Sequence, residues 1–280
     1  MHNRPIALVT GTSSGFGMHA SVALVKAGFH VISTMRDTSK RAELDKLASM
    51  HLASEHLEVL SLDVTNPAEI SRTIASILNR HQTIDLLLNN AGLACGGYVE
   101  EIASEEWRQQ FEVNVFGLIE VTRAVLPTMR EQKSGRIINL SSISGRFGFP
   151  GLAPYSASKH AVEGFSESLR LEMLPFGIHV VLIEPGSYRT SIWEKGIAQA
   201  HIRSDSPYQK QMNQMMKMVG KIVRDAPVPD EVIAAIVHAA TTPKPRLRYP
   251  VGRGVRLTMM AKQCLPWKWI ESVVLRKMKP

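Results

Sequence analysis

Residues 8–17 read Leu-Val-Thr-Gly-Thr-Ser-Ser-Gly-Phe-Gly, and this stretch decides the fold. It joins a short apolar run, Ile6–Thr10, to a segment with Ala20, Ala23 and Leu24 at helical spacing that stops at Gly28. Glycines between a strand and a helix allow a tight turn and a close approach of backbone to a pyrophosphate, which the positive end of the helix dipole attracts. The stretch therefore predicts a strand–turn–helix unit that binds a dinucleotide.

The same alternation of short apolar runs and longer amphipathic segments continues to about residue 185. The short runs have strand length and are rich in Val, Ile or Leu, as expected for strands buried on both faces. Alternation of strands and helices predicts an α/β fold, namely a single Rossmann-type doubly wound parallel sheet with helices on both faces. The later strands are predicted at His30–Thr34, Leu57–Leu62, Ile84–Leu88, Arg136–Leu140 and Ile178–Glu184, and the later helices at Pro67–Arg80, Trp107–Arg130 and Pro154–Leu174.

The chain has 280 residues, which suits one domain over residues 1–280. The regular pattern is predicted to stop after Pro185, and residues 187–228 look irregular and rich in Met. The two cysteines, Cys95 and Cys264, are too few for a disulfide framework or a four-cysteine zinc site. No metal site is expected.

The net charge of +8 at pH 7 first suggests nucleic acid, but its distribution argues against that partner. Residues 244–280 hold ten Lys or Arg and one acid, which makes +9, so residues 1–243 carry 23 bases and 24 acids, or −1. The excess charge belongs to a basic C-terminal extension, residues 244–280. We expect no nucleic-acid partner.

The first residues show no signal peptide, because the apolar run after Arg4 has only strand length. No uncharged apolar stretch approaches the roughly 18–20 residues that a membrane span needs. The sequence therefore predicts a cytoplasmic, reducing location.

The end of the second strand bears on the choice of cofactor. An acidic residue there binds the ribose 2′-hydroxyl of NAD, whereas an arginine suits the 2′-phosphate of NADP. Met35 stands where the acid would be and Arg36 follows it. The sequence favours NADP(H), with NAD(H) as the alternative if Asp37 contacts the ribose instead.

Tyr155 and Lys159 lie four residues apart at the start of a predicted helix, so both side chains share one face. A free tyrosine has a pKa near 10, and a nearby ammonium group favours its phenolate. The pair alone is weak evidence, since such spacing is common on exposed helices.

Six groups of residues occur together, in order and at characteristic distances: Thr10-Gly11-x3-Gly15-x-Gly17, Asn89-Asn90-Ala91-Gly92, Asn114, Ser142, Tyr155-x3-Lys159 and Pro185-Gly186. With this set the chain resembles the classical short-chain dehydrogenase/reductase family over residues 5 to about 190, and it is similar to the hydroxysteroid and retinol dehydrogenase branch. The resemblance implies an oxidoreductase that moves a hydride between NADP(H) and a carbonyl or alcohol.

The resemblance also implies a role for each residue. Tyr155 is implied as the general acid/base and Lys159 as the group that lowers its pKa and binds the nicotinamide ribose. Ser142 is implied as the hydroxyl that orients the substrate oxygen, and Asn114 as the holder of a water in a proton relay. The implied cofactor-binding residues are Gly11, Ser13, Ser14, Gly15, Phe16, Gly17, Arg36, Asp63, Val64, Asn90, Ala91, Gly92, Tyr155, Lys159, Pro185, Gly186 and Thr190.

Residues 187–228 fall where the family builds its substrate lid. Met212, Met216, Val219 and Val223 follow helical spacing, and methionines adapt to irregular apolar shapes. Core packing explains such a stripe equally well. An apolar substrate, such as a steroid, retinoid or long-chain carbonyl, is the resulting hypothesis.

Residues 253–280 add two apolar stripes, which contain Leu257, Met260 and Cys264 and then, after Pro266, Trp267 and Ile270, with basic residues among them. A basic helix with Trp on one side can lie on an anionic membrane surface, or it can pack on the body with solvated charges. Membrane contact through 253–280 and a homodimer are the partners considered besides the small-molecule substrate. The rival functions are a catalytically silent nucleotide-sensing or scaffold protein and a membrane-surface binding protein.

Overall fold

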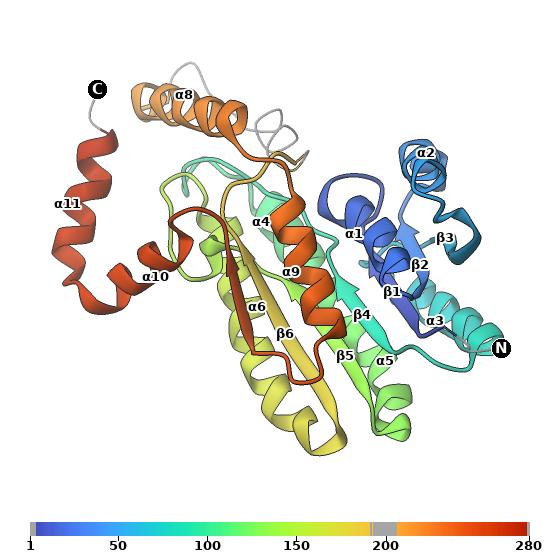
Figure 1. The fold of residues 1–280 in the computed structure, drawn as a ribbon. Coiled ribbons are helices and arrows are strands. Elements are labelled where there is room, and N and C mark those ends of the chain that lie inside the picture. Colours follow the sequence, from blue (N-terminus) through green and yellow to red (C-terminus); the bar gives the residue numbers. More distant parts are fainter. Residues whose placement is uncertain (1–3, 191, 193–205, 279–280) are drawn as a thin grey trace.

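A seven-stranded parallel sheet forms the centre of the computed structural model, which describes residues 4–190, 192 and 206–278. The strand order is β3-β2-β1-β4-β5-β6-β7 (Figure 1). The strands are β1 Ile6–Thr10, β2 His30–Met35, β3 Leu57–Ser61, β4 Leu86–Asn89, β5 Gly135–Leu140, β6 Ile178–Pro185 and β7 Arg248–Val251. The order reverses between β1 and β4, and ligands of doubly wound sheets bind at such a switch point.

Helices cover both faces of the sheet. Successive residues of β1 supply the two cores in turn: Ala7 and Val9 join one buried cluster, and Ile6 and Leu8 join the other. This division follows from the alternation of side chains along a strand. The first cluster packs under α1 Gly15–Lys26, α2 Ala42–Met50 and α9 Asp230–Thr241, and the second under α3 Pro67–His81, α5 Leu118–Gln132 and α6 Ala153–Met173.

The predicted Rossmann-type doubly wound sheet is confirmed, and the six predicted strands are present to within one or two residues. The prediction that the regular pattern stops after Pro185 was wrong, because α9 and β7 extend the sheet by one more strand. The sequence hides β7 because Arg-Tyr-Pro-Val is short and contains proline, which edge strands tolerate. Four residues of the basic segment 244–280 therefore belong to the sheet.

The helix predicted over Trp107–Arg130 begins at α4 Ser104–Phe111 and passes through a π-helical turn, Glu112–Gly117, before α5. A π turn inserts one residue into the helical repeat and often lies at a functional site. Asn114 lies inside this turn.

The C-terminal third adds three helices at one end of the molecule, namely α8 Gln209–Asp225, α10 Val255–Cys264 and α11 Trp267–Met278 (Figure 1). The helical spacing of Met212 and Met216 is thus confirmed as α8, and much of 187–228 is regular. Residues 191 and 193–205 of the predicted lid lie outside the described residues. Within the described chain, we find no helix long and apolar enough to cross a bilayer.

Candidate active site

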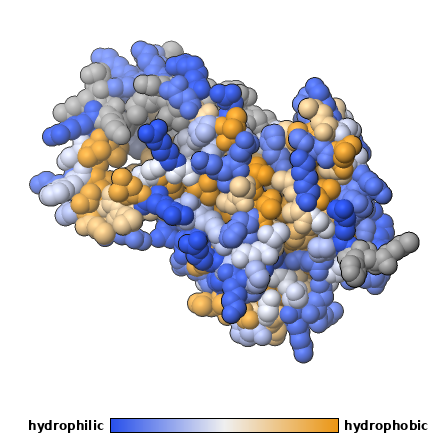
Figure 2. Space-filling model, viewed as in Figure 1, coloured by the Kyte–Doolittle hydropathy of each residue, from blue (hydrophilic) through white to orange (hydrophobic). Residues whose placement is uncertain are grey.

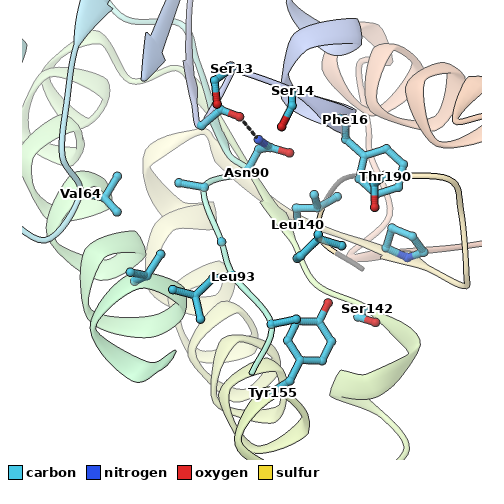
Figure 3. Close-up of a pocket in the computed structure, with 18 of the residues that line it drawn as sticks. Ser13, Ser14, Phe16, Val64, Asn90, Leu93, Leu140, Ser142, Tyr155 and Thr190 are labelled. Atoms are coloured by element: carbon cyan, nitrogen blue, oxygen red, sulfur yellow. Dashed lines mark hydrogen bonds between the residues drawn. The ribbon is translucent and has the colours of Figure 1, made fainter. Parts of the chain in front are cut away.

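One cavity of about 380 Å³ lies at the carboxyl ends of the central strands. Its walls come from the turn after β1, the ends of β2 to β6 and the start of α6 (Figure 3). Figure 3 shows Ser13, Ser14 and Phe16 at one end of the cavity, and Tyr155 and Ser142 at the other. A cavity with phosphate-binding backbone at one end and titratable groups at the other suits a long, anionic ligand with a reactive end.

Each glycine of the turn after β1 stands at a position where a side chain would be strained or would clash. Gly11 and Gly15 have φ of +71° and +60°, values that side chains disfavour. At Gly17 a Cβ atom would lie 2.4 Å from Nδ2 of Asn90 and 2.6 Å from the carbonyl oxygen of Gly11. Asn90 Nδ2 donates hydrogen bonds to the carbonyl oxygens of Thr10 and Gly11, each at 2.8 Å. The turn is therefore held against β4, and the first turn of α1 opens into the cavity.

The side chains of Arg36 and Asp37, at the end of β2, have different surroundings. Arg36 lines the cavity together with Met35. The Asp37 carboxylate instead accepts hydrogen bonds from the backbone N–H and the hydroxyl of Ser39, at 3.1 and 2.6 Å, as the cap of a 3-10 turn. These bonds lower the pKa of Asp37. The cation, rather than the acid, is thus available to a ligand at this end of the cavity.

Tyr155 is buried, with only 8% of its surface exposed, and its hydroxyl points into the cavity beside Ser142 (Figure 3). Burial raises the pKa of Tyr155, and a hydrogen bond with Ser142 opposes this rise. The hydroxyl is therefore protonated at neutral pH. The lowering of this pKa by Lys159, which the resemblance implies, stays a prediction.

Lys159 is buried one turn after Tyr155, and its Nζ donates a 2.7 Å hydrogen bond to the carbonyl oxygen of Leu140. This Nζ lies 5.8 Å from the centre of the Tyr155 ring. Burial lowers the pKa of Lys159 to about 8, and the charge of Glu163 opposes the shift. Because a desolvated ammonium gains much from a new acceptor, Lys159 is suited to binding ligand hydroxyls.

Asn114 has its side chain tied to the backbone rather than to the lysine. Its Oδ1 accepts from the N–H of Leu93 at 2.9 Å, and its Nδ2 donates to the carbonyl oxygen of Leu93 at 3.0 Å. A third contact joins Nδ2 to the hydroxyl of Ser158 at 3.3 Å. Asn114 thus fixes the loop that follows β4 and does not itself line the cavity.

A buried group of charges lies behind the lysine. Glu163 and Glu184 face one another, 5% and 1% exposed, and Arg248 Nε lies 3.0 Å from one carboxylate and 3.3 Å from the other. The Nε proton is donated to Glu163, so Arg248 makes a charge contact with Glu184 but donates no hydrogen bond to it. Burial and the Glu163 charge raise the pKa of Glu184 to about 7. Glu163 also accepts from Ser141, the neighbour of Ser142.

Most of the predicted site residues line this one cavity. They are Gly11, Ser13, Ser14, Gly15, Phe16, Arg36, Asp63, Val64, Asn90, Ala91, Gly92, Ser142, Tyr155, Lys159, Pro185, Gly186 and Thr190. Gly17 and Asn114 support the wall from behind. Lining residues that sequence reasoning missed are Leu62, Leu93, Ala94, Gln109, Val113, Leu140, Ser141, Tyr188 and Ile192. Leu62 and Leu140 end predicted strands and Ser141 directly follows one, which was the available signal.

One group of potential metal ligands occurs among the described residues, at the opposite edge of the sheet. His30 and His81 both contact Oε1 of Glu58, at 2.8 and 3.1 Å. Arg80 pairs with the other carboxylate oxygen. Because a guanidinium already neutralises this carboxylate, we assign no metal to it.

The chain is similar to known proteins over nearly its whole length. Residues 5–201 match the family model described as short chain dehydrogenase. The chain is 45% identical to the uncharacterized oxidoreductase YusZ of Bacillus subtilis, over 99% of each chain. It is 35% identical to the 3-ketodihydrosphingosine reductase of Bacteroides thetaiotaomicron, over 93% of each chain.

Solved structures show the same similarity. A short-chain dehydrogenase from Streptomyces avermitilis matches with a TM-score of 0.81 and 34% identity, over 99% of this chain and 96% of that one. The closed form of serine dehydrogenase, complexed with NADP+, matches with a TM-score of 0.76 and 30% identity, over 88% and 94%. With this fold, this cavity and these relatives, the chain belongs to the short-chain dehydrogenase family, whose members are dehydrogenases and reductases that act on CH–OH and C=O groups.

Proposed function

We propose that the chain reduces an apolar carbonyl compound with NADPH, and oxidises the matching alcohol in reverse, with Tyr155 as the general acid/base. The observation that carries this proposal is the convergence of Tyr155, Ser142 and Lys159 at one end of a single cavity. NADP(H), when bound, supplies or accepts the hydride.

The proton step follows from the burial of Tyr155. Since burial keeps its hydroxyl protonated at neutral pH, the resting site holds the proton that a reduced carbonyl oxygen needs. Ser142 stands beside this hydroxyl and donates a second hydrogen bond to the same substrate oxygen. Two donors aimed at one oxygen stabilise the negative charge that develops there.

Lys159 acts on the cofactor and on the tyrosine. Its ammonium can reach ribose hydroxyls from the floor of the cavity, and its charge favours the phenolate after Tyr155 has given up a proton. Asn114, tied to Leu93, fixes the loop after β4, and we propose that the relay water implied by the resemblance binds beside it.

The chain's lining residues fit a nicotinamide dinucleotide phosphate. The first turn of α1 and the glycines can hold the pyrophosphate, and Leu62, Asp63 and Val64 can flank the adenine. Pro185, Gly186 and Thr190 line the same cavity and can contact the nicotinamide. Arg36 can pair with a 2′-phosphate, which supports NADP(H) over NAD(H), and the NADP+ complex of serine dehydrogenase agrees with this preference.

An apolar substrate is supported by the wall near Tyr155. Leu93 lies near Tyr155 (Figure 3), and Ala94, Val113 and Ile192 are further apolar residues that line the cavity. One relative is named a 3-ketodihydrosphingosine reductase, and a keto substrate of that kind is in keeping with such a wall. We accordingly propose a long-chain or polycyclic carbonyl rather than a sugar.

The experiment is a panel of apolar ketones and sugars assayed with NADPH and NADH, on the native chain and on Tyr155→Phe. We expect Tyr155→Phe to lose turnover by roughly 10³-fold while NADPH still binds, because only the acid/base is removed. Tyr249→Phe, outside the cavity, is the matched control. Retained turnover in Tyr155→Phe would favour another acid, and a native chain that binds NADPH without turning over any panel member would favour the silent sensing role.

We also propose a domain organisation and an oligomeric state for the chain. We take residues 1–280 as one domain, with 187–228 as the substrate lid, and the cytoplasmic location stays a prediction from the sequence. A homodimer through α5 and α6 is supported by exposed apolar residues beside them, Phe116 at 51% and Leu171 at 74%. Light scattering of Phe116→Asp should show a monomer where the native chain shows a dimer.

A further inference from the structure

The two C-terminal helices, α10 and α11, expose an unusual amount of apolar surface. Of the fifteen large apolar side chains that are exposed among the described residues, seven lie between residues 257 and 275. Trp269 is 62% exposed, Val273 56% and Leu257 72%. Single exposed apolar residues need no explanation, but a cluster on adjacent helices marks an interaction surface. Figure 2 shows apolar atoms over these helices, with hydrophilic residues around them.

These helices are nevertheless docked on the body, so the outward face is defined. Ile270 of α11 is only 9% exposed, and α11 packs against α8. The Trp267 ring lies 6.3 Å from that of Phe147, and Lys262 of α10 donates to the carbonyl oxygen of Arg146. Trp269 and Val273 lie about 100° and 60° around the helix from Ile270, on one side of it, and their exposed fractions of 62% and 56% place this side of α11 in solvent.

Positive charges predominate around this face. Arg253, Arg256, Lys268 and Arg276 are exposed, and none forms an ion pair with another described residue. Residues 253–278 contain six bases and one acid, Glu271, while residues 1–243 sum to −1. The excess positive charge therefore attracts an anionic partner to this end of the molecule.

We propose that Leu257, Met260, Lys268, Trp269, Val273 and Arg276, here called the tail surface, dock the protein on an anionic lipid membrane. Exposed Trp and aliphatic side chains insert at the level of the lipid headgroups, and the cations beside them pair with anionic lipid. Neither helix is long enough to cross a bilayer, so the contact is peripheral.

The tail surface adjoins the substrate side of the molecule. α11 contacts α8. The sulfur atom of Met215, on α8, packs so closely against Gly151 that a Cβ atom added to this glycine would lie 2.2 Å from it. Gly151 belongs to the loop between Ser142 and α6, so one continuous set of contacts runs from the tail surface to the wall of the cavity. Docking would place the mouth of the cavity near the bilayer. The docking itself does not depend on the proposed reaction.

Vesicle flotation of the full chain tests the proposal. The probes are vesicles of phosphatidylcholine alone and of phosphatidylcholine mixed with phosphatidylglycerol in equal parts. We expect the native chain to float with the mixed vesicles, with a blue shift of tryptophan emission. Each basic residue near an anionic surface contributes roughly a 5-fold factor in partitioning, so the double variant Lys268→Gln and Arg276→Gln should bind about 25-fold more weakly.

A second double variant, Trp269→Gln with Val273→Gln, removes the apolar part and should also abolish the blue shift. The matched control is Lys46→Gln with Leu52→Gln on and beside α2, where both side chains are exposed on another part of the molecule. The control should float like the native chain. Because flotation reports no turnover, failure here leaves the proposed reaction untouched, and loss of activity leaves the docking untouched.

Three results would overturn the proposal. The native chain could fail to float with the mixed vesicles, or both tail variants could float as the control does. In the third, light scattering would show that the native chain self-associates through Trp269 and Val273, which would make a second copy the partner of this surface.

Discussion

Two regions of this molecule depart from the usual rule of apolar residues inside and polar residues outside, and they do so in opposite directions. Around α6, a lysine, two glutamates and a tyrosine hydroxyl are buried. On α10 and α11, tryptophan and aliphatic side chains face outward. Burying a charge costs free energy unless it is paired, and exposing apolar surface forgoes stabilisation. Because both arrangements cost stability, we propose that each serves a function, namely catalysis around α6 and membrane binding on α10 and α11.

The largest effect is expected when a buried lysine is replaced. Lys159→Met should lower kcat/KM by roughly 10²- to 10⁴-fold, because the cation next to the acid/base and the ribose is lost. The matched change in the other region is Lys262→Met, since Lys262 likewise donates from Nζ to a backbone carbonyl oxygen. Steady-state assays with NADPH should show native activity for Lys262→Met. Equal losses in both variants would remove the functional distinction between the two regions.

The next largest effect is expected when Arg36, an exposed cation outside the basic C-terminal extension, is replaced. Arg36→Ser should raise KM for NADPH roughly 10- to 100-fold and leave KM for NADH nearly unchanged, because a charge-assisted hydrogen bond to the 2′-phosphate is worth about 1.5–3 kcal/mol. Arg41→Ser is the control, because Arg41 pairs with Asp45 on the surface. A parallel rise for both cofactors would mean that Arg36 does not read the phosphate.

Glu184 should make stability depend on pH. Its folded pKa of about 7 lies above the ordinary value of 4.5, so the folded chain holds this proton more tightly than the unfolded chain does. The stabilising contribution is complete below pH 4.5 and is lost as the pH rises through 7. Native stability should therefore fall by about 1–3 kcal/mol between pH 5 and 8.

Glu184→Gln should remove this fall, and urea titrations at several pH values measure it. Glu167→Gln is the matched control, because Glu167 contacts the same Arg248 but is 53% exposed. If Glu184→Gln kept the full pH dependence, the proton would have to reside on another group.

The smallest effect is a difference in the free energy of unfolding between variants of two neighbouring residues in α11, Trp269 and Ile270. Trp269→Gln should change the free energy of unfolding by less than about 0.5 kcal/mol, because the side chain is 62% exposed. Ile270→Ala should cost about 1–3 kcal/mol, because this side chain is buried against the body. Thermal denaturation of the two variants compares them. Equal losses would show that the outward face of α11 is needed for folding.

Local features of the fold could be predicted from the sequence. The glycine turn, six strands and the Tyr155–Lys159 pair depend on residues close in sequence, where periodicity and spacing carry the information. The strand β7 escaped prediction because its four residues gain their structure from pairing with β6. The π-helical turn at Asn114 and the α9 helix were not predicted either.

The buried carboxylate pair could not have been predicted at all. Glu163 is on α6, Glu184 on β6 and Arg248 on β7, so only the folded sheet brings them together. The net-charge sum assigned Arg248 to the basic C-terminal extension. In the structure its guanidinium instead contacts the carboxylates of Glu163 and Glu184. Tyr188, whose hydroxyl bonds Glu231 at 2.6 Å, is a similar case, since its partner is 43 residues away.

The position of Arg248 so late in the chain also bears on how the protein is made. During synthesis, Glu163 and Glu184 leave the ribosome long before the guanidinium that neutralises them. Until residue 248 has emerged, closing α6 onto β6 would bury both carboxylates with the more distant Arg146, 3.8 Å from Glu163, in place of Arg248, and such incomplete pairing is unfavourable. We therefore expect this end of the sheet to close fully only after nearly nine-tenths of the chain has been synthesised, and a nascent chain halted earlier to keep an open, protease-sensitive α6.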